Sequence, residues 1–163
     1  DGLLELAASS TYSGVTLVTN GTLWVNGALN SGGGTVTVYG GATLGGTGVI
    51  SRAVVVATNG AVSPGTTNAG ILTVTGNVTL QPGATFTCLG GKMQVNGTLT
   101  LPTNATVNVM SPTSWTTLFS ATTLAGATDL SGWQIVGQHS TRVTIVGTDV
   151  VLKLFAGTLF VVH

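Results

Sequence analysis

Along most of the chain, apolar and polar residues alternate in short runs that recur roughly every 20 residues. Each repeat places apolar side chains at positions 0, +2 and +8, with a turn near position +5. The five repeats are Val15/Leu17/Leu23, Val36/Val38/Leu44, Val54/Val56/Val62, Val78/Leu80/Phe86 and Leu99/Leu101/Val107. Because side chains along a β-strand point alternately to its two faces, each 0/+2 pair predicts a short strand with one buried face.

Glycine, asparagine and proline punctuate the apolar runs and mark the ends of the predicted strands. Glycine and asparagine tolerate a positive φ, and proline presets the φ angle that many turns need. Threonine and valine, which are β-branched, fill much of the remaining sequence and favour strands over helices. The expected structural turn residues are Gly21, Gly41, Gly45, Gly46, Gly48, Gly60, Pro64, Gly65, Pro82 and Gly83.

Two all-β folds contain strands and turns of this kind. Antiparallel hairpins would give a β-sandwich, whereas a parallel β-solenoid would stack successive coils at a spacing of about 4.8 Å. The period and the recurrence of the same side-chain types at the same positions favour the solenoid. We expect a single solenoid domain over residues 1–154, with regular repeats over about 12–110. Residues 111–154 would form less regular coils and a closing element, and residues 155–163 an apolar tail.

Two stretches carry a pattern of a V-x-V strand, a glycine turn, a T-L-G-G-x-G corner and an S-P-G corner. They are VTVYGGATLGGTGVISRAVVVATNGAVSPG (Val36 to Gly65) and GILTVTGNVTLQPGATF (Gly70 to Phe86). This pattern resembles the autotransporter-associated β-strand repeat, also called the passenger-associated transport repeat. The resemblance extends over about residues 12–110 and is most specific over 36–86. It implies a right-handed parallel β-helix that is secreted or displayed on the surface of a bacterial cell.

Charge is nearly absent, because 5% of the 163 residues are charged and the formal net charge is zero. An ordinary soluble domain carries roughly a quarter charged residues. We expect no nucleic-acid partner and no membrane span, because there is no basic patch and no run of roughly 18 apolar residues. The cations Arg52, Lys92, Arg142 and Lys153 are scattered, and we expect them on strand surfaces.

The single cysteine and the first residue of the chain bear on its cellular context. Cys88 allows no disulfide within one chain and is expected as a buried thiol. The chain begins with Asp1 rather than methionine, so we expect a processed protein or a fragment.

The acidic residues are too few and too dispersed for the catalytic sites of β-helix enzymes. They are Asp1, Glu5, Asp129 and Asp149, with none between residues 6 and 128. A catalytic pair would need Asp129 and Asp149 to converge, and turn residues are the simpler interpretation. His139 adjoins Ser140 without a nucleophile elbow. We therefore predict no enzymatic activity and no catalytic, cofactor or metal site; a polysaccharide-acting enzyme is the least favoured alternative.

Five large aromatic residues leave two interpretations open. They are Tyr12, Trp24, Tyr39, Trp115 and Trp133. Gathered on one face, they would form a platform for sugar rings; scattered, they would pack against the solenoid. Tyr39 falls at an outward position of the repeat, so binding to a glycan or another surface stays an alternative.

Both ends of the chain are apolar at the places where a solenoid needs a cap. Leu3, Leu4 and Leu6 lie near one end, and Leu159, Phe160, Val161 and Val162 near the other. A strand from a neighbouring molecule can pair with the open edge of such a fold. We hypothesise a non-enzymatic extracellular structural protein whose copies associate head to tail into a filament or surface layer. Residues 1–10 and 155–163 would be the junction strands; the alternative is an adhesin or a passenger stalk.

Overall fold

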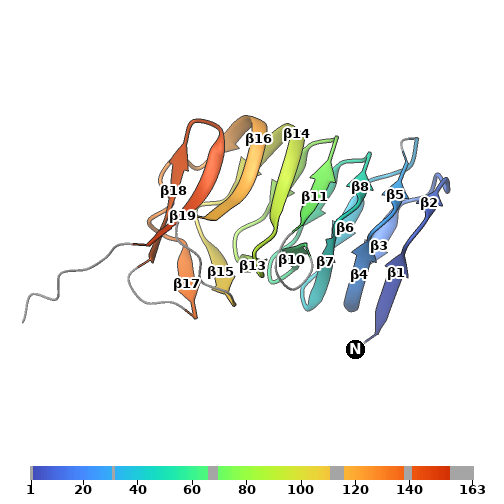
Figure 1. The fold of residues 1–163 in the computed structure, drawn as a ribbon, viewed down its shortest axis with the longest axis horizontal. Coiled ribbons are helices and arrows are strands. Elements are labelled where there is room, and N and C mark those ends of the chain that lie inside the picture. The colour runs from blue at the N-terminus through green and yellow to red at the C-terminus, as the bar shows by residue number, and fades with distance from the viewer. Residues whose placement is uncertain (1, 31, 66–69, 111–115, 138–140, 155–163) are drawn as a thin grey trace, which may run out of the picture.

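The strands of the chain wind into a β-solenoid of stacked coils (Figure 1). This computed structural model describes residues 2–30, 32–65, 70–110, 116–137 and 141–154. Every regular element in these ranges is a β-strand, which confirms the predicted all-β solenoid and excludes the β-sandwich. None of the described residues belongs to a helix long and apolar enough to cross a membrane.

One face of the solenoid, called face A, is a seven-stranded parallel sheet. Its strands are, in order, β1 (Leu3–Leu6), β4 (Gly21–Val25), β7 (Ala42–Gly46), β10 (Ala61–Pro64), β13 (Ala84–Cys88), β15 (Ala105–Val109) and β17 (Gln134–Val136). Neighbouring strands come from successive coils, so the chain returns to this face once per turn.

Two further faces complete each coil. Face B contains β2 (Ser9–Ser10), β5 (Ala28–Leu29), β8 (Val49–Ile50) and β11 (Ile71–Val74). Face C contains β3 (Thr16–Val18), β6 (Val36–Val38), β9 (Val54–Val56) and β12 (Val78–Leu80). The long strand β14 (Lys92–Leu101) runs along both, because it pairs with β11 and then with β12. From β1 to β14 the chain therefore completes about five three-sided coils.

Apolar side chains at equivalent positions stack into ladders inside the solenoid. The ladder on face A runs through Leu4, Leu23, Leu44, Val62, Phe86, Val107 and Ile135. The ladder on face C includes Val36, Val54, Val78 and Leu99. All apolar positions predicted for the second to fifth repeats are 4% exposed or less. Each such side chain stabilises the fold by about 1.5–3 kcal/mol relative to an exposed one.

In the first repeat Leu23 is buried as predicted, but the prediction for the pair Val15 and Leu17 is wrong by one residue. Val15 and Leu17 are 64% and 54% exposed, whereas Thr16 stacks on Val36 and Val18 is buried. The local sequence Val-Thr-Leu-Val has apolar residues at both phases of the alternation, so the pattern does not decide which face is buried. The register with the next coil decides it.

Left-handed residues form a column at the corner between faces C and A. Gly41, Asn59 and Gly83 have φ angles of 83°, 60° and 81°. The amide of Gly41 donates to the carbonyl of Asn59 (3.0 Å), and the amide of Asn59 donates to the carbonyl of Gly83 (3.2 Å). The left-handed residue is thus Asn59 rather than the adjacent Gly60. Space restricts Gly60 instead, because an added Cβ would lie 2.6 Å from a carbonyl oxygen of the preceding coil.

The other expected turn residues lie at the ends of strands, mostly on face A. Gly45 and Gly46 end β7 and pair with Ser63 and Pro64 of β10. Gly65 follows β10, and its amide donates to the carbonyl of Gly46 (2.8 Å). Gly21 begins β4, Gly48 lies between β7 and β8, and Pro82 precedes Gly83.

An antiparallel hairpin covers the C-terminal end of the core. β16 (Thr116–Gly126) continues the parallel stack on β14. β19 (Asp149–Leu154) then pairs antiparallel with β16 and with β18 (Thr141–Val146). Val143, Val150 and Leu152 of this hairpin are 5% exposed or less, so the hairpin closes the core at this end.

Candidate interaction surface at the N-terminal end

The described part of the solenoid leaves strand edges unpaired at its N-terminal end. β1, β2 and β3 are terminal strands of their sheets, and their outer edges have no strand partner among the described residues (Figure 1). Leu4 stacks on the buried Leu23 and occupies the same inward position, yet it is 62% exposed. Its neighbour Leu3, on the outward side of β1, is 67% exposed. The apolar interior of the solenoid therefore reaches solvent here.

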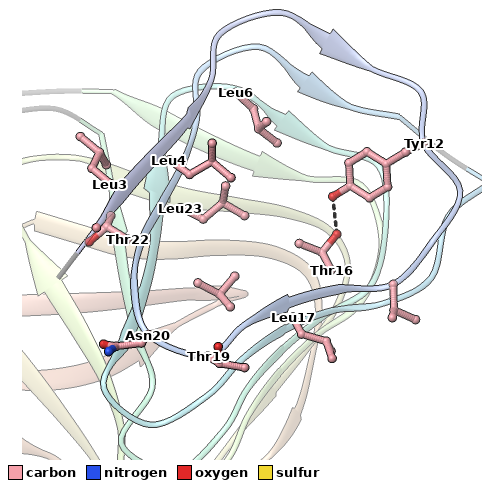
Figure 2. Close-up of a pocket in the computed structure, with 13 residues that line it drawn as sticks. Leu3, Leu4, Leu6, Tyr12, Thr16, Leu17, Thr19, Asn20, Thr22 and Leu23 are labelled. Carbon is pink, nitrogen blue, oxygen red and sulfur yellow. Dashed lines mark hydrogen bonds between the residues drawn. The ribbon is translucent and has the colours of Figure 1, made fainter.

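A groove of about 580 Å³ lies across this open end. Figure 2 shows leucines of β1 along one side and Tyr12 and Leu17 along the other, with Leu23 beneath Leu4. Charged residues are absent from the described residues that line it. Leu3, Leu4 and Leu6, which the sequence suggested as interface residues, all contribute to the lining. The groove can therefore accept apolar side chains together with a backbone that pairs with β1.

A buried arginine fixes the loop that borders the groove. Arg52 is 4% exposed, so its expected place on a strand surface is wrong. Its Nε donates to the carbonyl of Asn30 (2.9 Å), its Nη1 to the carbonyl of Gly14 (3.0 Å) and its Nη2 to the carbonyl of Tyr12. The guanidinium also lies 4.5 Å from the ring centroid of Tyr12. The carbonyls and the ring replace the lost hydration of the cation, which makes its burial tolerable.

Tyr12 itself is held on both sides. Its hydroxyl forms a hydrogen bond with the hydroxyl of Thr16, as Figure 2 shows. Its ring remains 40% exposed at the rim of the groove. The sequence pattern does not indicate the pairing of Tyr12 with Arg52, because the residues are far apart in the chain and share no repeat position. The alternation around Val15 and Leu17 is ambiguous, so the sequence did not indicate that these two residues are exposed either.

The acidic side chain of β1, Glu5, is engaged by a corner asparagine. Asn26 Nδ2 donates to Glu5 Oε1 (2.8 Å). Asn26 Oδ1 in turn accepts hydrogen bonds from the amide (3.1 Å) and the hydroxyl (3.3 Å) of Thr47. This network links three successive coils, and Glu5 is not among the described residues that line the groove.

One carboxylate of the C-terminal part, that of Asp129, is engaged in a turn. Asp129 accepts hydrogen bonds from the amide (2.9 Å) and the hydroxyl (3.0 Å) of Ser131. The pKa of Asp129 lies below its ordinary value, mainly because the carboxylate accepts hydrogen bonds from the amide and the hydroxyl of Ser131. The nearby Arg142 lowers it further to a smaller extent. Asp149 pairs across the hairpin with Val146. His139 lies outside the described residues, which contain no group of three or more metal-binding side chains.

The aromatic residues differ in their surroundings. Trp133 is 6% exposed, and its Nε1 donates to the carbonyl of Pro102 (3.0 Å). Trp24 is half-buried on face A, whereas Tyr39 is 43% exposed after β6 of face C. Trp115 lies outside the described residues. Trp133 is therefore a packing residue, and Tyr39 remains available on the surface.

One comparison links the chain to an autotransporter adhesin. No family model matches the chain. Over 64 residues it is 44% identical to an autotransporter adhesin. That protein is the adhesin BmaC autotransporter of Brucella suis biovar 1 (strain 1330); the match covers 39% of this chain and 2% of the adhesin. The similarity supports the resemblance to autotransporter passengers, while membership of the specific repeat family stays a prediction.

Proposed function

We propose that the chain is a rod-forming segment of a bacterial cell-surface adhesin. The observation that carries this proposal is the 44% identity to an autotransporter adhesin in a chain that folds as a β-solenoid. The chain spans 2% of the length of that relative, so the role concerns a segment of such a protein. Its place would be outside the cell, attached to the surface or released from it.

The fold suits a rod whose length matters more than any single side chain. Each coil contacts its neighbours through the same ladders, so coils add length without changing the cross-section. The outward positions of face A carry Thr22, Thr43, Thr85 and Thr106 at equivalent places. Uncharged hydroxyl side chains keep such a surface hydrated, and the carboxylates of Glu5 and Asp129 accept hydrogen bonds within the fold. A non-enzymatic role is therefore the function we assign.

The proposal is tested by removing coils and then restoring their number. In the bacterium that makes the protein, residues 21–101, from β4 to β14, are deleted in frame. Attachment to glycan-coated surfaces and to host cells is measured, together with surface exposure by protease accessibility. We expect attachment to fall while the remainder stays exposed outside the cell.

A replacement then separates a rod from a specific binding surface. The deleted coils are replaced by four tandem copies of residues 21–41, which are one coil with its turn. A rod predicts restored attachment, whereas binding by particular residues of the deleted coils predicts none. Circular dichroism of the purified replacement checks that it folds. Unchanged attachment after deletion, or a protein found only inside the cell, would refute the proposal.

A further inference from the structure

The dipeptide Asn-Gly occurs at the corner between faces C and A in two different coils. Asn20-Gly21 leads into β4 in the first coil, and Asn59-Gly60 leads into β10 in the third. The strand registers make residue 18 level with residue 56, and residue 21 level with residue 60. The turn of the first coil is therefore one residue shorter than the turn of the third coil, although both end in the same two residues.

The difference in turn length gives the two glycine amides different acceptors. In the third coil the amide of Gly60 donates across the turn to the carbonyl of Ala57 (2.9 Å). In the first coil the amide of Gly21 donates to Oδ1 of the preceding Asn20 (2.8 Å). Since Oδ1 is bonded to Cγ, the amide nitrogen of Gly21 lies within about 4 Å of Cγ of Asn20. Groups held this close need little rearrangement to react with each other.

We infer that Asn20-Gly21 is a site of spontaneous deamidation, with water as the second reactant. The amide nitrogen of Gly21 gives up its proton and attacks Cγ of Asn20. The bond from Cγ to Nδ2 then breaks, and Nδ2 takes up a proton and leaves as ammonia. Water opens the resulting succinimide at one of its two carbonyls, which leaves an aspartate or an isoaspartate in place of Asn20. Glycine as the second residue favours the attack, because it has no Cβ to hinder rotation of the backbone.

The two remaining Asn-Gly pairs of the chain are more restrained. The amide of Gly27 donates to the carbonyl of Leu6 in the preceding coil (2.8 Å). The side chain of Asn26 is also held by its hydrogen bonds to the first and third coils. Asn96-Gly97 lies inside β14, which is paired with strands of the coils on both sides. Such pairing must open before the backbone can rotate toward the succinimide.

The site is open to water, and its product alters the surface. Asn20 is exposed, so water and hydroxide reach its side chain. Deamidation adds a negative charge to a chain whose formal net charge is zero. Isoaspartate also lengthens the backbone by a methylene group next to the start of β4. The predicted junction residues 159–162 take no part in this chemistry and lie outside the described residues.

Peptide mapping of the full chain tests the assignment. The folded chain is kept in mildly alkaline buffer, mass spectrometry follows deamidation at each Asn-Gly pair, and isoaspartyl methyltransferase confirms isoaspartate. Asn20 should react about five- to tenfold faster than Asn59, because the amide of Gly60 must first lose its hydrogen bond to the turn. In urea the two sites should react at similar rates, since their dipeptides are identical. A folded chain in which Asn59 or Asn96 reacts as fast as Asn20 would overturn the inference.

An insertion separates the effect of the turn from that of the dipeptide. One threonine inserted between Thr19 and Asn20 gives the first coil the turn length and the Thr-Asn-Gly sequence of the third. The amide of Gly21 should then donate to the carbonyl of Thr19, and deamidation of Asn20 should slow by about five- to tenfold. Circular dichroism verifies the fold of this variant, and in urea it should react as fast as the unaltered chain. An unchanged rate in the folded insertion variant would refute the role assigned to the short turn.

Discussion

Replacing Arg52 by methionine should loosen the first coil while the later coils remain folded. Arg52 belongs to the third coil, yet it donates hydrogen bonds to Tyr12 and Gly14 of the first coil and to Asn30 of the second. It is 4% exposed, and its guanidinium stacks on the ring of Tyr12. Methionine keeps part of the aliphatic stem but removes every donor.

The size of the effect follows from these contacts. A hydrogen bond that involves a charged group contributes about 1.5–3 kcal/mol. Tyr12 and Gly14 are exposed, so water can replace part of what their carbonyls lose. We therefore expect the first coil to lose about 2–4 kcal/mol of stability rather than the full sum of three bonds. In a solenoid each coil contacts only its neighbours, so the loss stays local.

Hydrogen exchange read by mass spectrometry resolves such a local loss. Peptides over residues 7–18 should exchange about 30-fold to several hundred-fold faster in Arg52→Met, from 1.4 kcal/mol per factor of ten. Peptides over residues 78–109 should exchange at unchanged rates. Arg52→Lys, which keeps the charge but lacks the planar fork, should give an intermediate rate. Uniform acceleration along the chain, or none over residues 7–18, would refute the assigned role of Arg52.

Three further changes test the ladder, the left-handed column and the acidic turn. Phe86→Ala should lower the free energy of unfolding by about 3–5 kcal/mol in urea titrations, because Phe86 is 2% exposed and its ring centroid lies 4.5 Å from that of Phe119. Asn59→Val should cost about 1–3 kcal/mol at a φ of 60°, whereas Asn59→Gly should be nearly neutral. Asp129→Ala should lower the melting temperature at neutral pH, because the hydrogen bonds from Ser131 lower the pKa of Asp129 in the folded state. That stabilisation is present above the ordinary pKa and disappears as pH falls through the lowered one, so the two melting temperatures should converge in acid.

The repeat made most of the fold predictable from the sequence. In the second, fourth and fifth repeats a threonine separates the two apolar positions of the strand, so the alternation determines which side chains are buried. In the third repeat Val55 stands at that place, and the spacing of the repeat identifies Val54 and Val56 as the inward residues. Val36, Val54 and Val78 accordingly stack as the pattern predicts. The first coil escaped prediction because Val15 and Leu17 compete with Val18 for the interior, and only contact with the next coil resolves the choice.

The candidate site was predictable only in part. The leucines of β1 are visible in the sequence as an apolar run near one end, and they line the groove. The position of Tyr12 beside Arg52 depends on backbone carbonyl groups from three segments. Every residue has such a carbonyl, so the sequence does not reveal which ones accept hydrogen bonds from the arginine. From the sequence alone, an isolated arginine in a chain with few charges is therefore predicted to lie on the surface.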